Sequence, residues 1–346
     1  MAPGVFYFRR ELSFACVPAH FWVHVSADYW MYVDDPDLVK NTVSHTRTVL
    51  DWYASHLRSD GLLGKMTWWE FADWTANYRF GVPPQDNDGG STYLTLQFLS
   101  ALQDAMEMEE RYGSPERVAS YRAIISKASN ALNRENWDPQ RGLYSDTPSR
   151  NSWSQEANIL AVMTGVAPAE RRAPILRRLL VSQTQVATKA EGVMVPAMSA
   201  SSYYFRFYLS RALEKAGLGD LYLGQLAPWY HMLELGLSTW AETPEPTRSD
   251  CHAWSASPNF DLLTVVAGIH PATPGFHTVK ITRHLQGLHD LAATMPHPRG
   301  AVHARYHLEG TRWTAEVTLP ADTTGILSWK GEKLPLHAGL QVLKLP

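Results

Sequence analysis

The hydrophobic pattern of this 346-residue chain changes its period at Gly268, and this change is what most constrains the fold. Before this glycine, apolar residues recur at the three-to-four-residue spacing of amphipathic helices. After it, His270–Gly275 forms a cluster of helix breakers, and short runs of alternating apolar and polar residues follow, as is typical of β-strands. We therefore expect a mainly α-helical domain at 1–268 and a small β-domain at 269–346, because segregated helices and strands argue against a doubly wound α/β fold.

The helical part is predicted to be a series of hairpins with short connections. Asp37 is expected to cap the second helix, and Ser249–Asp250 is expected to cap the last one. Two connections, 60–90 and 236–249, are longer than the others, and long loops in a compact helical array often carry function. The nine predicted helices cover residues 19–33, 37–57, 91–111, 114–135, 153–164, 168–183, 201–216, 220–234 and 250–267.

The second part is predicted to be an antiparallel β-sandwich. Turn signals at Glu309–Gly310 and Lys330–Gly331 separate some of its alternating runs. The predicted strands cover residues 276–281, 301–308, 313–319, 325–329 and 340–345.

The charge balance excludes several partners. The chain has 31 Lys and Arg residues against 34 Asp and Glu residues, without the basic clusters that nucleic acids and anionic membranes require. No run of about 18 apolar residues predicts a transmembrane helix, and residues 1–10 lack the order of a signal peptide. We therefore expect a cytoplasmic protein whose partner is a small-molecule or oligosaccharide glycoside, with no nucleic acid and no membrane.

The sequence predicts neither a cofactor nor a metal. It contains no GxGxxG, P-loop, HExxH or GxSxG motif, and its 14 histidines are scattered, with no i, i+4 pair beside an acid. Cys16 and Cys251 are the only cysteines and are far apart in the sequence, so we expect two buried free thiols.

Tryptophan is unusually frequent, with 13 Trp beside 15 Tyr. Indole rings are flat and apolar with a hydrogen-bond donor at the edge, so they suit both a large aromatic core and a sugar-stacking site. The positions at which the tryptophans cluster decide between these two interpretations.

One cluster lies at Thr67–Trp74, with the sequence TWWEFADW. Glu70 and Asp73 stand three residues apart among three tryptophans, two of which are Trp69 and Trp74. If the segment is helical, the two carboxyl groups share a face. A carboxyl group beside indole rings loses hydration and its pKa rises, which suits a general acid. The alternative is a loop whose aromatic side chains fill the core while the acids cap helices.

A second cluster lies in the loop that follows the eighth predicted helix. Its two prolines exclude a helix interior, so Glu242 is expected on a constrained loop near Trp240. His252 and Trp254 are expected on the first turn of the next helix. An acid, a histidine and tryptophans this close together predict a sugar-binding subsite, and the alternative is helix capping with the histidine in the core.

The segment Ser201–Tyr208 carries aromatic residues nearly all round a predicted helix, which indicates a central, buried helix. Arg206 in this setting needs a carboxylate partner or a ligand. We favour a structural ion pair for Arg206, next to Tyr204.

Two stretches resemble bacterial α-L-rhamnosidases of glycoside hydrolase family 78. Thr239–Glu242, TWAE, followed by Ser249–Pro258, SDCHAWSASP, resembles the late-barrel motif of that family. Val266–Phe276 resembles the point at which the family leaves its helical barrel for a C-terminal β-sandwich. The resemblance covers residues 18–345 and implies an (α/α)6-type barrel of helical hairpins, here incomplete, followed by an antiparallel β-sandwich.

The resemblance also implies an inverting mechanism, in which two carboxyl groups about 6.5–9.5 Å apart act as acid and base. Glu242 matches the position of the family's general base, and His252 matches a histidine that contacts the sugar. Asp73 and Trp74 match a Gly-Asp-Trp-like stretch that lines the pocket, although Ala72 here stands in place of the glycine.

One motif of the family has no match in this chain. The general acid of the family lies in an Arg- and Gly-Asp-containing motif on an early barrel segment. The chain therefore resembles a family member without its N-terminal domains and first barrel helices, and Glu70 or Asp73 is the candidate replacement acid. Missing helices would leave apolar helix faces uncovered, which favours a homo-oligomer.

Three functions stay open, of which we favour the first. It is a glycosidase that resembles inverting α-L-rhamnosidases and cleaves a terminal sugar with Glu242 as general base. The second is a degenerate family member that binds carbohydrate with little hydrolysis. The third is a polysaccharide lyase, which would need a tyrosine base and an arginine or histidine that neutralises the uronate carboxylate, and for which Tyr204 and Arg206 are the candidates.

Overall fold

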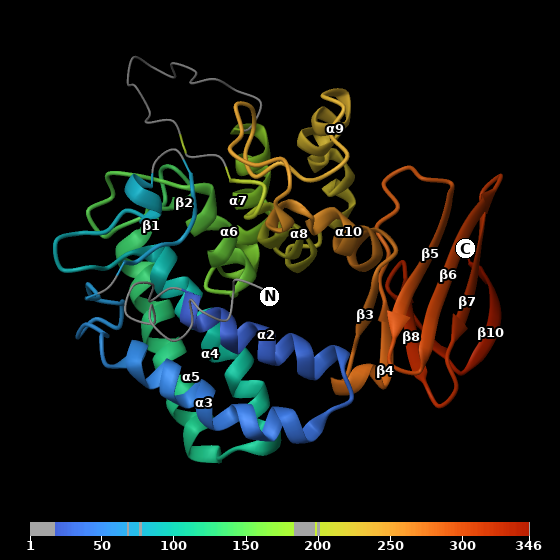
Figure 1. The fold of residues 1–346 in the computed structure, drawn as a ribbon, viewed down its shortest axis with the longest axis horizontal. Coiled ribbons are helices and arrows are strands. Elements are labelled where there is room, and N and C mark those ends of the chain that lie inside the picture. Colours follow the sequence, from blue (N-terminus) through green and yellow to red (C-terminus); the bar gives the residue numbers. More distant parts are fainter. Residues whose placement is uncertain (1–17, 68, 76–77, 183–197, 199–200, 346) are drawn as a thin grey trace. The chain divides into compact units, whose positions relative to one another are not determined.

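The computed structural model describes residues 18–67, 69–75, 78–182, 198 and 201–345. These residues divide into two compact units, and Figure 1 colours them along the chain. The first unit holds the described residues up to Ala27 together with Asp37–Ala216. The second unit holds Asp28–Pro36 and the described residues from Gly217 onward.

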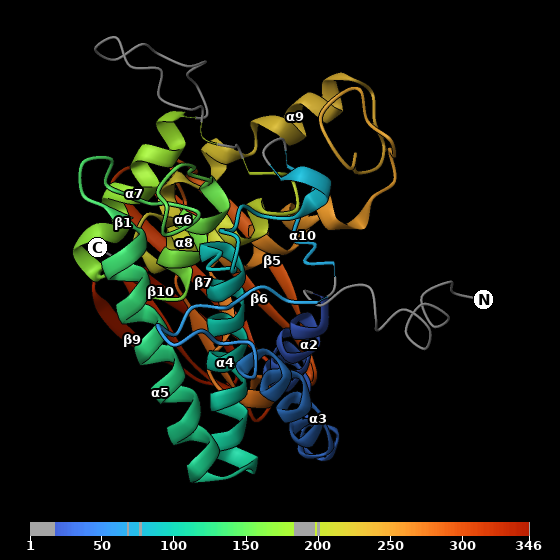
Figure 2. The same ribbon diagram turned by 90° about the vertical axis from the view of Figure 1, so that its left-hand side faces the viewer.

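Helices dominate the first unit, and several of their ends follow the capping rules. The Ser91 hydroxyl accepts a hydrogen bond from the Leu94 amide at 3.4 Å, and Ser114 accepts one from Arg117 at 3.3 Å ahead of a proline at the first helical position. The helices α4 and α5 form a hairpin and lie side by side in Figure 1 and Figure 2. The helices are α2 (Pro18–Tyr32, whose end belongs to the second unit), α3 (Pro36–Ala54), α4 (Thr92–Tyr112), α5 (Pro115–Ala131), α6 (Gln155–Met163), α7 (Ala169–Ser182) and α8 (Arg206–Lys215).

An ion pair joins α3 to the hairpin. Arg47 donates two hydrogen bonds to the buried Glu109 carboxylate, at 2.6 and 2.7 Å. Glu109 also accepts from the Ser114 amide at 3.0 Å, so the same carboxylate fixes the turn between α4 and α5. Because both oxygens of Glu109 have donors, the cost of burying this charge is offset.

Two helices begin at other residues than the sequence predicted. Asp37 does not cap α3 but lies in its first turn, because Pro36 has the fixed φ of a first helical residue and needs no hydrogen-bond acceptor. α8 begins at Arg206, later than predicted, because the Ser202 hydroxyl accepts from the Phe205 amide at 3.1 Å and holds a turn there. The first unit also contains the 3₁₀ turn η1 (Arg79–Gly81), the π-helical turn η2 (Leu132–Asn136) and the hairpin of β1 (Trp137–Asp138) and β2 (Leu143–Tyr144).

The helix predicted at 220–234 is interrupted in the structure. It becomes the 3₁₀ turns η3 (Gly219–Leu221) and η4 (Leu223–Gln225), followed by the short α9 (Ala227–Glu234). Pro228 explains the start of α9, since proline cannot donate to a preceding turn and therefore favours the first turn of a new helix.

The helix predicted at 250–267 is interrupted as well. It becomes the 3₁₀ turn η5 (Ala253–Ser255), α10 (Ser257–Asp261) and the π-helical turn η6 (Leu262–Val266). The prediction that Ser249–Asp250 caps this helix is wrong, because a proline near the start of α10 sets the helix start further along the chain.

The β-domain of the second unit is a pair of four-stranded sheets, which confirms the predicted sandwich, although β3, β5 and β9 were not among the predicted strands. The turns predicted at Gly310 and at Lys330–Gly331 are confirmed, and all three residues have positive φ. One sheet has the order β10-β7-β6-β5 and the other β3-β4-β8-β9. The strands are β3 (Ile269–Pro271), β4 (Thr278–Ile281), β5 (Asp290–His297), β6 (Gly300–Glu309), β7 (Arg312–Leu319), β8 (Thr324–Trp329), β9 (Glu332–Leu336) and β10 (Gly339–Leu345).

The expectation of purely antiparallel pairing is wrong at one place. Strands β4 and β8 pair in parallel, with Thr278 opposite Thr324. A parallel pair needs a long crossover between its strands. Here the chain passes through β5, β6 and β7 of the other sheet before it returns as β8.

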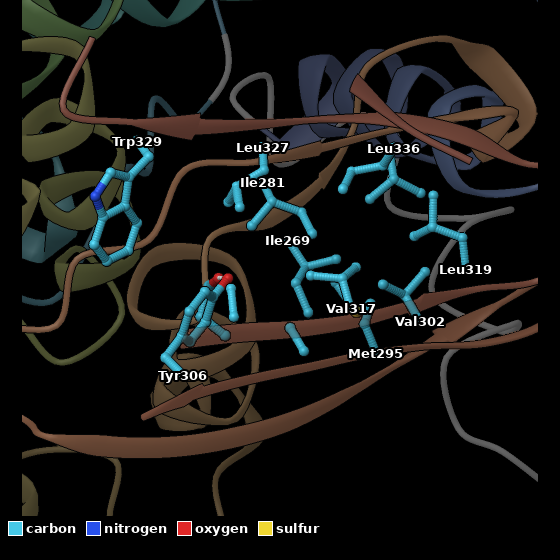
Figure 3. Close-up of a cluster of buried hydrophobic side chains, with 14 of the residues drawn as sticks. Ile269, Ile281, Met295, Val302, Tyr306, Val317, Leu319, Leu327, Trp329 and Leu336 are labelled. Atoms are coloured by element: carbon cyan, nitrogen blue, oxygen red, sulfur yellow. Dashed lines mark hydrogen bonds between the residues drawn. The ribbon is translucent and has the colours of Figure 1, made fainter. Parts of the chain in front are cut away.

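The core of the β-domain lies between its two sheets (Figure 3). Ile281 and Leu327 extend from one sheet toward Val302 and Val317 of the other, and all four side chains are fully buried. Burial of each such side chain contributes about 1.5–3 kcal/mol to folding. The two rows of apolar residues therefore hold the sheets together.

Gly268 allows the helical segment of this unit to meet the sheet closely. Its φ is +75°, and a Cβ atom there would lie 2.2 Å from the backbone of Thr282. Its carbonyl also accepts from the Thr282 amide at 2.8 Å. A larger residue at this crossing would force the backbone apart.

Leu327→Ala tests the role of this core, with Ile326→Ala on the same strand as a matched control. Leu327 is fully buried, whereas Ile326 is 39% exposed on the opposite face. We expect the first substitution to lower the free energy of unfolding by about 2–5 kcal/mol and the second to change it by about 0.5 kcal/mol, measured by urea denaturation. Equal effects of the two substitutions would contradict the assigned sheet faces.

Candidate active site

The tryptophan-rich segment of the first unit is not helical. Its described residues lie in extended and irregular backbone, and the Ala72 amide donates to the Gly81 carbonyl at 2.8 Å. The condition under which Glu70 and Asp73 would share a helical face is therefore not met, and the segment is a loop, as the alternative stated. Trp68 lies outside the described residues. Both carboxyl groups are nevertheless buried, in different surroundings.

Glu70 acts as a bridge within the loop. One carboxylate oxygen accepts from the Met66 amide at 2.7 Å, and the other accepts from the Gln85 side chain. Glu70 is 5% exposed. Both oxygens are thus engaged in holding the loop.

Asp73 is fully buried, and its surroundings leave one oxygen unused. Its Oδ2 accepts from the Ser202 hydroxyl at 2.6 Å, whereas Oδ1 has no hydrogen-bond partner among the described residues. Burial raises the pKa of Asp73 to about 6, against the hydrogen bonds from Ser202 and the Trp74 backbone, which lower it. A carboxyl group in such a site holds its proton at mildly acidic pH, as a general acid must.

Trp69 and Trp74 form an exposed aromatic surface in the same loop. They are 44% and 41% exposed, and their ring centroids are 6.2 Å apart with Phe71 next to both. The alternative that these two side chains fill the core is therefore wrong. Exposed indole faces beside a buried acid are the arrangement that a sugar ring can stack on.

The aromatic segment before α8 also belongs to the surroundings of Asp73. The Tyr204 and Tyr208 hydroxyls are 2.9 Å apart, and burial raises the pKa of Tyr204 well above its ordinary value, with a further contribution from the charge of Asp73. Burial lowers the pKa of the half-buried Arg206 guanidinium, and the charge of Tyr203 offsets part of this shift by raising the pKa. Tyr204 thus lies close enough to Asp73 to be affected by its charge. Arg206 is the first residue of α8.

Sequence reasoning did not single out Glu156, a second buried acid of the first unit. Glu156 is 0% exposed, and neither of its carboxylate oxygens has a hydrogen-bond partner among the described residues. Burial raises its pKa well above the ordinary value, and the charges of Asp73 and Asp146 raise it further. Burial and the charges of two neighbouring acids therefore disfavour the ionised form of Glu156.

Hydroxyl groups surround these acids. The Ser154 hydroxyl donates to Asp146 at 2.5 Å and accepts from Tyr78 at 3.3 Å. Tyr93 is buried next to them, and burial raises its pKa well above the ordinary value. One signal for Glu156 existed in the sequence, since it is the only charged residue of α6, a helix buried almost all round.

In the second unit, Glu242 is buried on the loop before η5, as the prolines predicted. It is 3% exposed, and Arg248 donates to both carboxylate oxygens, at 2.9 Å to Oε2 and also to Oε1. Arg248 itself is 71% exposed, and Glu242 raises the pKa of its guanidinium. Two parallel hydrogen bonds from one guanidinium fix the orientation of the Glu242 carboxyl group.

His252 and Trp254 lie beside Glu242. The His252 Nδ1 atom is 4.0 Å from Oε2 of Glu242, and the Trp254 indole donates to the Glu242 carbonyl at 3.3 Å. The centroids of the His252 and Trp254 rings are 4.5 Å apart. Their expected place on the first turn of a helix is wrong, since His252 precedes the 3₁₀ turn η5 and Trp254 lies within it. The alternative of a core histidine is also wrong, because His252 is only partly buried.

The loop is held by backbone pairing rather than by a helix cap. The Glu242 amide donates to the Ser249 carbonyl at 2.9 Å, and the His252 amide donates to the Trp240 carbonyl at 2.8 Å. Trp240, which is half-buried, is held by the second of these hydrogen bonds. Cys251 lies in the same loop and its thiol is exposed, so the expectation of a buried thiol is wrong there. Cys16 lies outside the described residues.

No group of three or more His, Cys, Asp or Glu side chains suited to a metal ion occurs within the described ranges. Over the same ranges, no helix is long and apolar enough to cross a membrane.

Helical hairpins followed by a two-sheet β-domain define the class of six-hairpin glycosidases that carry a C-terminal β-domain. The chain belongs to the bacterial α-L-rhamnosidase family: the six-hairpin glycosidase domain of bacterial α-L-rhamnosidases matches residues 1–261, and the C-terminal domain of bacterial α-L-rhamnosidases matches residues 268–337. The expected fold class and family are thereby confirmed. No curated protein sequence matches the chain.

Solved structures support the same fold. The family 78 rhamnosidase of Bacillus sp. GL1 is 24% identical with a TM-score of 0.70, over 87% of this chain and 31% of that one. The Aspergillus terreus α-L-rhamnosidase is 16% identical with a TM-score of 0.74, over 94% and 38%. The Streptomyces avermitilis α-L-rhamnosidase, solved with L-rhamnose, is 15% identical with a TM-score of 0.72, over 94% and 32%. The chain thus spans about a third of the length of these proteins.

The pKa of Asp73 predicts a pH-dependent stability. An acid whose pKa rises from 3.8 to about 6 on folding stabilises the fold below 3.8, and this contribution is lost as the pH rises through 6. Relative to Asp73→Asn, we expect the free energy of unfolding to fall by up to about 3 kcal/mol between pH 3.5 and pH 7. Urea denaturation of both proteins across this range measures it, and a pH-independent difference would contradict the raised pKa.

Proposed function

We propose that this chain takes part in α-L-rhamnoside hydrolysis, with Glu242 of the second unit as a candidate general base and Asp73 of the first unit as a candidate general acid, each defined by its surroundings within its own unit. Membership of the rhamnosidase family supports the substrate class. The observation that carries the acid assignment is the buried Asp73, whose Oδ1 atom has no partner among the described residues and whose pKa is about 6.

Asp73 suits the acid role better than Glu70 does. A general acid must hold a proton and present it to the leaving oxygen. The Asp73 carboxyl is protonated in part at mildly acidic pH, and its Oδ1 atom has no hydrogen-bond partner among the described residues, whereas both oxygens of Glu70 accept hydrogen bonds within the loop. Glu70 is accordingly assigned a structural role, and it serves as the control for Asp73.

Glu242 suits the base role because an arginine orients its carboxyl group and a histidine lies beside it. Arg248 pairs with the carboxylate, and His252 stands 4.0 Å away. The base of an inverting glycosidase takes a proton from water and must be ionised beforehand. Trp254 and His252 beside it offer a ring face and a polar edge to a sugar.

The two roles predict different responses to the leaving group. Glu242→Gln should lower kcat by a factor on the order of 10²–10⁴ on both p-nitrophenyl and methyl α-L-rhamnoside, because activation of water is needed in either case. The loss of kcat caused by Asp73→Asn should be at least about tenfold smaller on p-nitrophenyl α-L-rhamnoside than on methyl α-L-rhamnoside, since the p-nitrophenolate leaving group departs without a proton.

Glu70→Gln is the matched control, because Glu70 is an acid of the same loop. Any loss of kcat in this variant should be equal on both substrates. If Asp73→Asn and Glu70→Gln respond alike to the leaving group, Asp73 is not the acid.

One observation favours a second candidate, a carbohydrate-binding protein with little hydrolysis. Arg248 occupies both oxygens of Glu242, so a water molecule would have to share this carboxylate with a guanidinium. In contrast, a lyase is disfavoured, because its tyrosine base must lose a proton and burial raises the pKa of Tyr204 well above its ordinary value.

Arg248→Ala separates the two candidates. If Arg248 supports an ionised base, its removal should lower kcat on p-nitrophenyl α-L-rhamnoside about tenfold or more while L-rhamnose binding, measured by calorimetry, changes little. An increase of kcat would mean that the guanidinium blocks Glu242, and the wild-type chain would then serve mainly in binding.

A further inference from the structure

Arginine side chains gather where α7 meets the β1–β2 hairpin of the first unit (Figure 2). The segment 132–182, which forms this region, contains seven arginines and no lysine. It contains five acids, of which Asp146 and Glu156 are buried. The surface of this region is therefore positive, although the whole chain has a net charge of −3. The seven arginines are Arg134, Arg141, Arg150, Arg171, Arg172, Arg177 and Arg178.

Two arginines of α7 face the hairpin. Arg171 and Arg178 are two helical turns apart on the same side of α7, about 10.5 Å along its axis. Arg171 donates to the Asn133 side chain at 2.9 Å, and Arg178 donates to the Arg141 carbonyl. These contacts bring arginines from separate parts of the sequence onto one surface.

Two of the guanidinium groups lie over indole rings. The Arg171 Cζ atom is 4.1 Å from the centroid of the Trp137 ring, and the Arg141 Cζ atom is 3.7 Å from that of Trp153. An indole face attracts a guanidinium without neutralising its charge and holds the planar group in one orientation. The stacked guanidinium groups are thus positioned before a ligand arrives, which lowers the entropic cost of binding.

The acids of this surface offset only part of its charge. Glu135 pairs with the adjacent Arg134 at 2.7 Å, and the Asp138 carboxylate stands 3.7 Å from the Arg141 guanidinium. Asp138 also accepts from the Arg141 amide at 3.1 Å, so it helps to hold the turn of the hairpin. Within the part of the chain that the structure describes, the other five arginines have no carboxylate partner.

The ligand that fits such a surface is a chain with several carboxylate groups. The planar fork of a guanidinium binds a carboxylate through two parallel hydrogen bonds, and the absence of lysine from the segment favours this directional recognition. Single-stranded nucleic acids need free aromatic faces for their bases, whereas Trp137 and Trp153 already carry arginines. Because the chain belongs to a glycosidase family, a polymer of sugars is the matching partner.

We propose that Arg141, Arg171 and Arg178 form an arginine surface that binds a polysaccharide whose sugar units carry carboxylate groups. This surface goes beyond the proposed hydrolase function, because it would hold a polymer without taking part in cleavage. The proposal therefore does not require turnover, and the two proposals can fail separately.

Calorimetric titration of the full chain with hexagalacturonate at low ionic strength tests the arginine surface. Arg178 is exposed, so its substitution leaves the fold intact. Arg178→Gln should raise the Kd about tenfold, since one charge-assisted hydrogen bond is lost. Arg178→Lys should recover only part of the affinity, because an ammonium group keeps the charge but lacks the planar fork.

Arg122→Gln is the matched control, since it removes the same charge from an exposed arginine of α5 in the same unit. This variant should bind hexagalacturonate as the wild-type chain does, and maltohexaose, a neutral chain of the same length, should not bind. Glu242→Gln should also bind hexagalacturonate normally. If this pattern holds while no rhamnoside is hydrolysed, the arginine surface stands and the hydrolase proposal fails.

Three results would overturn the arginine surface. In the first, Arg178→Gln and Arg122→Gln weaken the binding of hexagalacturonate equally, which would indicate a general attraction between charges. In the second, maltohexaose binds as tightly as hexagalacturonate. In the third, a thymidine hexanucleotide binds more tightly than hexagalacturonate and loses affinity in Arg178→Gln, which would assign the surface to a nucleic acid.

Discussion

The hydrogen bond from Ser202 to Asp73 joins two segments 129 residues apart and keeps a carboxyl group inside the first unit. Ser202 also accepts from the Phe205 amide and so sets the turn that precedes α8. One hydroxyl therefore positions both the acid and the aromatic segment beside it. Burial raises the pKa of Asp73, and the hydrogen bond from Ser202 offsets only part of this shift. The carboxyl group can therefore hold a proton at mildly acidic pH.

The two candidate catalytic acids are stabilised in opposite ways. Burial raises the pKa of Asp73, and it raises the pKa of the neighbouring Glu156 as well. Glu242 is nearly as deeply buried but accepts hydrogen bonds from the exposed Arg248. Such a separation of environments is how two identical chemical groups take acid and base roles.

The second unit shows how one short loop serves two purposes. Its backbone hydrogen bonds hold Glu242 beside His252, and they hold Trp240 at the wall of an uncharged cavity. The β-domain of this unit packs around its own core and adds no side chain to the cavity.

The sequence by itself determined the helix-to-strand change at Gly268, most helix positions, the sandwich and the clustering of Glu242 with His252 and Trp254. Local spacing, capping residues and prolines carry that information. Only the tertiary structure decided that Trp69 and Trp74 are exposed, that Arg248 pairs with Glu242, and that Glu156 is buried beside Asp73. Burial and partner choice depend on segments far apart in the chain, and these do not meet until the fold forms.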